Sequence, residues 1–161
     1  MNIRNHTTWL AFLVSQGIFL LLLFPLQSCT DTERSPIPDM QVSLTIDLNY
    51  QDADLVPALA TKSFTVPRVA TDKLGFGGVL VINSYNANGA PTLFAYDLAC
   101  PVEVERNVKV IADEAGRATC PKCGATFALA WGSGMPESKS KHPLKSYLVR
   151  QTGERKYSVR N

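Results

Sequence analysis

Histidine is scarce in this chain of 161 residues, and its scarcity limits the chemistry on offer. The chain has two histidines, and His142 is the only one after residue 6. A Ser/His/Asp triad would need His142, which lies between Lys141 and Pro143 in a polar stretch without an identifiable partner. The sequence therefore argues against a triad hydrolase and, more broadly, favours a binding or electron-transfer module over an enzyme.

Excess charge of one sign is also lacking. The chain carries 16 Lys and Arg residues against 14 Asp and Glu residues, which gives a net charge of +2. The basic residues are scattered or stand beside acids, so no basic stripe is visible. We expect no nucleic-acid partner. The apolar share of 45% and the charged share of 19% are those of an ordinary globular protein.

Long hydrophobic runs are absent after residue 26. The one long run, residues 9–26, follows Arg4 and is interrupted by Ser15, Gln16 and Pro25. A basic start, an apolar centre and a small residue before a boundary are typical of a secretory signal. The interruptions make an uncleaved membrane anchor the weaker alternative, since the run is at the lower limit for crossing a bilayer.

The boundary itself reads Leu26-Gln27-Ser28-Cys29 and resembles a bacterial lipobox. The resemblance implies a signal peptide over residues 1–28 and lipidation of Cys29, which would attach the protein to a membrane surface. Thr30, where an Asp often retains lipoproteins at the inner membrane, favours the outer membrane of a bacterial cell envelope. Residues 29–40 contain Pro36 and Pro38 and no apolar periodicity, which predicts a flexible tether.

Helical periodicity is lacking in the rest of the chain. Residues 41–48 alternate apolar and polar side chains, and residues 79–82 form a short apolar run that indicates a buried strand. Further strands are expected at residues 92–99, 108–111, 127–131, 144–150 and 155–160, the last two joined by a hairpin turn at Thr152-Gly153, and residues 64–67 are expected to form a short extended piece. We therefore predict one all-β domain over residues 41–161. We expect Phe127 and Trp131 in its core, and a polar loop over residues 132–143.

Three of the four cysteines gather in one stretch, and this is where specific chemistry is expected. Cys100 begins the segment Cys-Pro-Val-Glu, and Cys120 and Cys123 belong to Cys-Pro-Lys-Cys-Gly-Ala-Thr-Phe. The glycine-rich turn at residues 75–78, by contrast, precedes a strand, so we do not expect it to bind phosphate at a helix N-terminus.

The spacing of these segments resembles the motif of the Rieske iron–sulfur family. That family has Cys-x-His, a gap of similar length and Cys-x-x-His, followed by Gly, a small residue and an aromatic residue. The resemblance covers roughly residues 75–160, with its motif core over residues 92–150. It implies antiparallel sheets that carry a small subdomain of two cluster-binding loops, with electron transfer through a [2Fe–2S] centre as the function.

The ligands depart from the family pattern at both histidine positions. Val102 and Cys123 stand where the resemblance places the two histidines, and Cys100 and Cys120 match the two cysteines. A Rieske centre holds one iron with two Cys and the other with two His. With His142 as the only histidine of the mature chain, residue count excludes an ordinary Rieske centre.

Three interpretations of the thiols remain open. The first is a metal-free structural or binding module in which Cys100 forms a disulfide with Cys120 or Cys123, as an oxidising compartment favours. The second is a variant site in which Cys100, Cys120 and Cys123 hold a [2Fe–2S] cluster or zinc, with Glu103, Asp97 or His142 as fourth ligand. The third is thiol–disulfide exchange at Cys120 and Cys123, which the absence of a following helix disfavours. Residues 132–143 are the expected contact for an unidentified protein partner.

Overall fold

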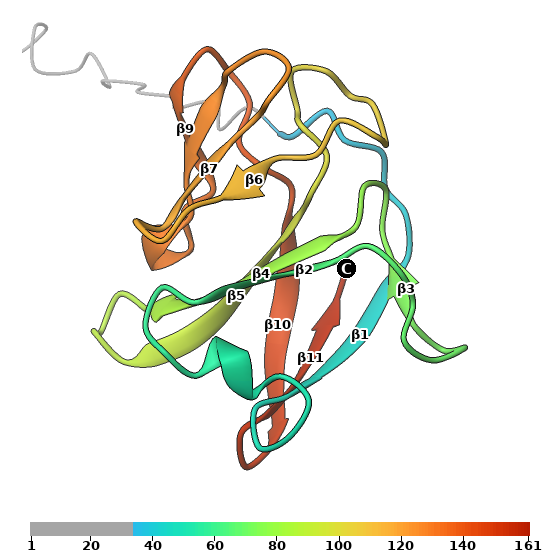
Figure 1. Cartoon of the computed structure of the whole chain (residues 1–161), viewed down its shortest axis with the longest axis vertical. Coiled ribbons are helices and arrows are strands. Elements are labelled where there is room, and N and C mark those ends of the chain that lie inside the picture. The colour runs from blue at the N-terminus through green and yellow to red at the C-terminus, as the bar shows by residue number, and fades with distance from the viewer. Residues whose placement is uncertain (1–33) are drawn as a thin grey trace, which may run out of the picture. The chain divides into compact units, whose positions relative to one another are not determined.

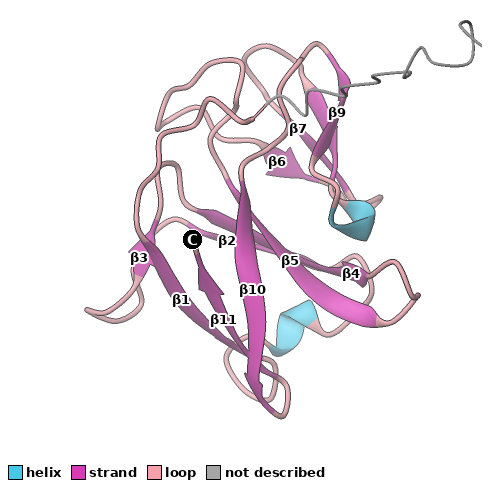
Figure 2. Cartoon of the chain, turned by 180° about the vertical axis from the view of Figure 1, so that it is seen from behind, coloured by secondary structure: helices cyan, strands magenta, loops and turns pink. Residues whose placement is uncertain are grey.

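The computed structural model describes residues 34–161, which form a single β domain with two antiparallel sheets (Figures 1 and 2). The predicted signal peptide, the lipobox and Cys29 lie outside the described residues. Within residues 34–161, no helix is long and apolar enough to cross a membrane. The all-β prediction is confirmed. The two helical turns of the described part, η1 (Ala53–Leu55) and η2 (Ala130–Gly132), are each a single 3₁₀ turn.

The larger sheet has seven strands in the order β2-β4-β5-β10-β11-β1-β3. Its strands are β1 (Val42–Asp47), β2 (Thr61–Phe64), β3 (Lys73–Leu74), β4 (Val79–Tyr85), β5 (Pro91–Asp97), β10 (Ser146–Gly153) and β11 (Lys156–Arg160). Two residue pairs, Ser146 with Tyr96 and Tyr147 with Ala95, connect β10 to β5. The sheet therefore consists of two halves with a narrow junction.

The smaller sheet has four short strands in the order β6-β7-β8-β9 and lies above the larger sheet in Figure 1. Its strands are β6 (Ile111–Ala112), β7 (Arg117–Thr119), β8 (Thr126–Ala128) and β9 (Met135–Ser138). The chain passes from β5 into this sheet and returns from it into β10. The loops at this passage contain the three cysteines.

Strand β4 explains how one domain supports two cores. Val79 and Val81 pack into the core of the larger sheet, whereas Leu80 and Ile82 pack toward the smaller sheet. All four side chains are fully buried. Because successive side chains of a strand point to opposite faces, a continuous apolar run is what a strand buried on both faces requires. The predicted buried strand is thus confirmed, and it separates the two cores.

The glycine-rich turn before β4 is held in place by Asp97 at the end of β5. The Asp97 carboxylate accepts hydrogen bonds from the backbone N–H groups of Phe76 and Gly77 at 2.9 Å and of Ala99 at 2.7 Å. The Tyr147 hydroxyl on β10 donates to the same carboxylate. A side chain at Gly77 would bring its Cβ within 2.6 Å of the Ala99 nitrogen. Asp97 therefore fixes the point at which the chain leaves β5 for Cys100.

Several strand predictions need correction. Of the strand expected at residues 108–111, only Ile111 belongs to a strand, β6. Residues 108–110 form separate backbone hydrogen bonds with residues 98–100 instead. The strand expected at residues 127–131 ends at Ala128, and Trp131 adopts a φ of 62°. Trp131 is 64% exposed, so its prediction as a core residue was wrong, whereas Phe127 is fully buried as expected.

The segment predicted as a polar loop, residues 132–143, contains β9. β9 has the sequence Met-Pro-Glu-Ser and is an edge strand of the smaller sheet. An edge strand tolerates proline and needs no apolar alternation, so the usual strand signal is missing.

The described end of the predicted tether packs against the domain. Ile37 is 3% exposed. The Lys145 ammonium donates to the Ile37 carbonyl at 3.2 Å and to the Pro38 carbonyl at 3.0 Å, and it forms an ion pair with Asp39. One buried isoleucine among polar and proline residues leaves no periodic signal, so sequence alone does not show where the chain joins the domain.

Candidate metal centre

Two loops of the same local conformation carry the three cysteines. We call them finger 1 (residues 100–104) and finger 2 (residues 120–124). In finger 1 the Val104 N–H donates to the Cys100 carbonyl at 2.9 Å, and in finger 2 the Gly124 N–H donates to the Cys120 carbonyl at 2.9 Å. The fifth residue has a positive φ in both, 52° at Val104 and 70° at Gly124. Each finger is thus the same tight turn, opened by Cys-Pro.

The equivalence extends to the sulfur atoms. The Cys100 sulfur accepts hydrogen bonds from the backbone N–H groups of Val102 and Glu103. The Cys120 sulfur accepts them from Lys122 and Cys123, which occupy the same two positions of finger 2. Backbone N–H groups directed at a sulfur stabilise a thiolate, the form that binds metals. The backbone donors of each turn therefore favour the thiolate form of its first cysteine, Cys100 or Cys120, which is the form that binds a metal.

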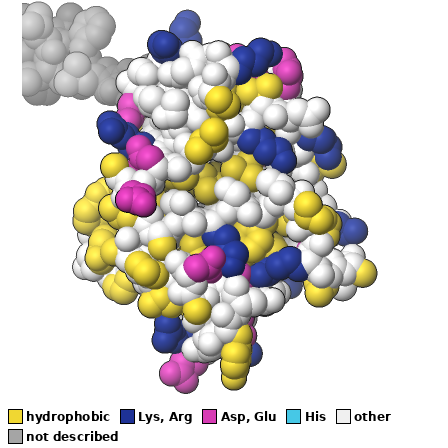
Figure 3. All heavy atoms as spheres, viewed as in Figure 1, with side chains coloured by type: hydrophobic (Ala, Val, Ile, Leu, Met, Phe, Trp, Pro, Cys, Tyr) yellow, Lys and Arg dark blue, Asp and Glu magenta, His cyan; other side chains and the backbone are white. Residues whose placement is uncertain are grey.

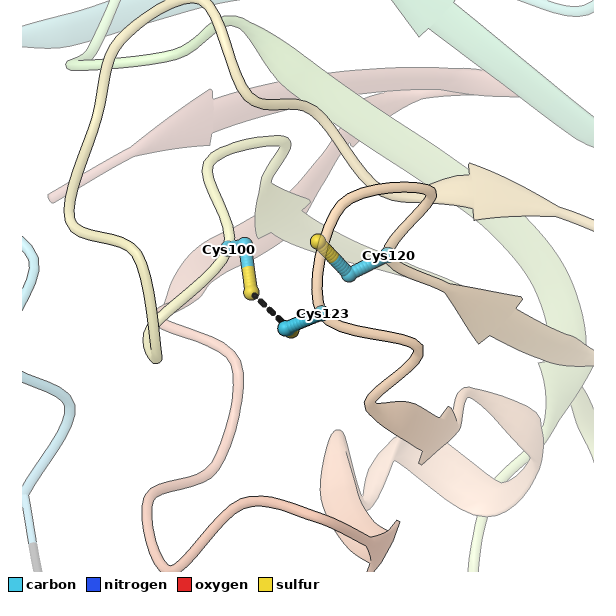
Figure 4. Close-up of side chains that lie close together, drawn as sticks. All are labelled: Cys100, Cys120 and Cys123. Carbon is cyan, nitrogen blue, oxygen red and sulfur yellow. Dashed lines mark hydrogen bonds between the residues drawn. The ribbon is translucent and has the colours of Figure 1, made fainter.

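The two fingers bring the three thiols together. Figure 4 shows Cys100 from finger 1 facing Cys120 and Cys123 from finger 2. All three sulfur atoms lie within 4.8 Å of one another, and those of Cys100 and Cys123 are 3.7 Å apart. Cys100 and Cys120 are buried and Cys123 is half-buried. These three residues form a cluster that can hold a metal ion, as the sequence predicted.

The thiols differ in acidity because their surroundings differ. Burial raises the pKa of the Cys100 thiol to about 12, despite the backbone donors at its sulfur. Burial also opposes ionisation of Cys120, but there the donors outweigh it and the pKa is lowered. Cys120 is therefore the first of this pair to ionise, and a cation at the centre would stabilise the remaining thiolates by charge attraction.

The three thiols are free in the structure, and no disulfide joins any two cysteines of the described part of the chain. The 3.7 Å separation of the Cys100 and Cys123 sulfurs is well beyond an S–S bond of about 2.05 Å. It agrees instead with two ligands of one tetrahedral ion, because metal–sulfur bonds of about 2.3 Å place two sulfurs about 3.8 Å apart.

A two-iron cluster fits this arrangement poorly. In a [2Fe–2S] centre the ligands divide into two pairs on different irons, and ligands of different pairs are farther apart than ligands of one ion. Here all three sulfurs are within 4.8 Å. Val102, at one of the family's histidine positions, is 42% exposed and has no metal-binding atom. The donor set matches a single ion better than the cluster that the family resemblance implies.

Of the three residues named as a fourth ligand, none belongs to the compact sulfur cluster of the described chain. Asp97 is fully buried, and its carboxylate is engaged by three backbone N–H groups and by Tyr147. His142 is half-buried, and its backbone N–H and carbonyl both bond the Ser140 hydroxyl. The structure thus gives Asp97 a role in the fold that the sequence did not indicate.

Glu103 is a stronger candidate for the fourth ligand than Asp97 or His142, because it occupies the position in finger 1 that Cys123 occupies in finger 2. Its carboxylate is largely covered, with 16% of the side chain exposed, and Oε2 lies 2.7 Å from the Lys122 ammonium. Lys122 also contacts Glu105 at 2.7 Å. Hydrogen bonds to these two carboxylates raise the pKa of Lys122, which therefore keeps its charge and links the two fingers. The two Cys-Pro segments signal this pair of loops in the sequence, whereas their shared backbone conformation is visible only in the structure.

No protein-family model and no curated protein sequence matches this chain. Among solved structures, the domain is similar to the crystal structure of a protein assigned as the small subunit of an NADH-dependent nitrite reductase from Mycobacterium tuberculosis. The two are 18% identical, with a TM-score of 0.41, and the match covers 76% of this chain and 97% of the other. This likeness is too distant to carry an argument about function.

Proposed function

We propose that this protein is a lipid-anchored module of the bacterial cell envelope, most simply on the outer membrane, whose Rieske-like domain binds a single zinc ion. Cys100, Cys120 and Cys123 supply three thiolates, and Glu103 supplies the fourth donor. The observation that carries this proposal is the repeated finger conformation, in which Glu103 holds the position in finger 1 that Cys123 holds in finger 2. Three thiolates with one further donor form a set that zinc accepts in tetrahedral sites.

The charges of this donor set are balanced locally. Three thiolates and a carboxylate around Zn²⁺ leave a net charge of −2, and Lys122 lies beside the carboxylate. A site closed by four protein donors is typical of structural zinc, which stabilises the fold instead of performing a reaction.

Two matched substitutions separate this proposal from the iron–sulfur alternative. Glu103→Cys places a thiol at the fourth position of finger 1, and Val102→Cys places one at the family's histidine position. If a single ion is held, Glu103→Cys gives a four-thiolate site, and the thiolate-to-metal absorption of the Co²⁺-loaded protein rises by about a third while Val102→Cys leaves it unchanged. If a [2Fe–2S] cluster is held, the anaerobically purified wild-type protein is coloured, and a cluster EPR signal appears on reduction.

Metal content and thiol titration of the same purified protein test the disulfide alternative. A metal-free protein with one titratable thiol would overturn the zinc proposal and support a disulfide-stapled module. Cys123→Ser distinguishes the remaining roles, because unchanged metal content and stability would mean that Cys123 is not a ligand.

The membrane part of the proposal is tested separately. Cys29→Ser removes the residue that the lipobox resemblance marks for lipidation. We expect the wild-type chain in the membrane fraction, with a mass increase at its mature N-terminus, and the variant without that increase. Wild-type chain that lacks the added mass would contradict the lipid anchor without affecting the zinc site.

A further inference from the structure

A second region of the domain, separate from the thiols, has the character of a ligand site. A cleft of about 620 Å³ opens between the glycine-rich turn at residues 75–78 and the segment that follows finger 1. Its volume is within the range of small-molecule sites. Three basic side chains, Lys73, Arg106 and Lys109, line it, and Asp72 is the one acidic residue of its lining.

In the described part of the chain, these three cations have no ion-pair partner. Asp72 is buried, and its carboxylate accepts backbone hydrogen bonds from Arg68 at 2.9 Å and Val69 at 3.3 Å. Figure 3 shows several Lys and Arg side chains on the right-hand side of the domain, the side on which Figure 1 places β3. Three cations against one carboxylate leave the lining of the cleft with a net positive charge.

Arg106 is held in position. Its guanidinium lies over the Phe76 ring, 5.1 Å from the centroid, and Nη2 donates to the Met40 sulfur at 2.9 Å. A thioether is a weak acceptor, so this contact leaves most of the donor capacity of the guanidinium for a ligand. A planar guanidinium fixed on an aromatic ring matches the oxygens of a phosphate group.

The opposite wall has little side-chain bulk. Gly77 and Gly78 are buried beneath the cleft, and any side chain at Gly77 would collide with Ala99. The acid beneath this wall, Asp97, is engaged by Phe76, Gly77, Ala99 and Tyr147. The missing side chains of this wall are thus required by its packing against Ala99, and the backbone of the turn lines the cleft together with Lys73, Arg106 and Lys109.

We propose that this cleft binds a phosphate-bearing ligand, either a soluble phosphate compound or the headgroup of an anionic phospholipid. The chemistry of recognition is the same for both sources. Met40, the last residue of the predicted tether, and Gln41 line the cleft, so a lipid headgroup would reach it where the tether joins the domain. The site is independent of the metal at the fingers.

Calorimetric titration of the full chain in an uncharged detergent at low ionic strength tests the proposal. The probes are sodium diphosphate, short-chain phosphatidylglycerol and, as a neutral control, short-chain phosphatidylcholine. We expect saturable binding of at least one anionic probe and none of the neutral lipid. Binding of diphosphate identifies a soluble ligand, and binding of phosphatidylglycerol alone identifies the headgroup.

Arg106→Gln and Lys109→Gln locate the site. Each is expected to weaken binding about tenfold or more, since each removes a charge-assisted contact. Arg150→Gln removes the same charge from an exposed position on β10 and is expected to leave binding unchanged. Equal weakening by Arg150→Gln would reduce the effect to overall charge and overturn the proposal, as would failure of both anionic probes to bind the folded wild-type chain.

Discussion

The two sheets of this domain are stabilised in different ways. The larger sheet contains strands of up to eight residues around an apolar core, in which Ile46, Leu55, Val79, Val81 and Val159 are fully buried. The smaller sheet has strands of two to four residues, and its core includes Cys100 and Cys120. Short strands bury little surface and form few ladder bonds. The larger sheet should therefore be stable without metal, whereas the fingers depend on what the thiols bind.

The largest effect is expected where the larger core is damaged. Ile46→Ala removes a fully buried side chain from β1 and should lower the free energy of unfolding by about 3 kcal/mol, because the cavity is only partly refilled. Chemical denaturation measures this loss, and metal content should stay the same at low denaturant. Ile111→Ala in β6 is the control, since Ile111 is 64% exposed. Equal losses from the two variants would contradict the proposed division of stability.

An intermediate effect is expected at the narrow junction between the two halves of the larger sheet, where β10 pairs with β5. Tyr147→Phe removes the hydroxyl that donates to the buried Asp97 carboxylate and should cost about 2 kcal/mol, the usual range for a bond to a charged group. Burial and the Asp97 charge both raise the pKa of Tyr147, so the hydroxyl remains a donor at all ordinary pH values. Denaturation again gives the loss.

Tyr96→Phe provides the comparison for Tyr147→Phe. The Tyr96 hydroxyl donates to a neutral carbonyl, that of Leu129, at 3.3 Å. Its removal should cost less than half as much. A larger loss from Tyr96→Phe would mean that the Asp97 network does not stabilise the junction.

The smallest effect is expected at the charged link between the fingers. Lys122→Met removes the contacts to Glu103 and Glu105, and should weaken zinc binding by no more than about fivefold, because exposed ion pairs contribute little. Competition with a chromophoric chelator measures the affinity. Lys141→Met, an exposed lysine of the long loop, should have no effect. A loss of a hundredfold or more would show that Lys122 does more than balance charge.

The sequence predicted some parts of the fold better than others. Alternation in β1 and the apolar run of β4 predicted both strands correctly, because burial on one or two faces leaves a direct pattern in the residues. Trp131 was misjudged, since hydrophobicity does not show that the backbone turns to a φ of 62° at that residue. The edge strand β9 was missed for a related reason: a polar edge strand has no pattern that separates it from a loop.

The sequence by itself determined the donor inventory: three thiols in two Cys-Pro segments and too few histidines for a Rieske centre. Only the tertiary structure decided which donors meet. The Asp97 carboxylate accepts hydrogen bonds from the glycine-rich turn and is not a ligand of the thiol cluster. Glu103 has the position in finger 1 that Cys123 has in finger 2, and it contacts Lys122. The reason is physical: residue type and spacing specify what a side chain can bind. Its partners depend on hydrogen bonds and packing between segments far apart in the chain.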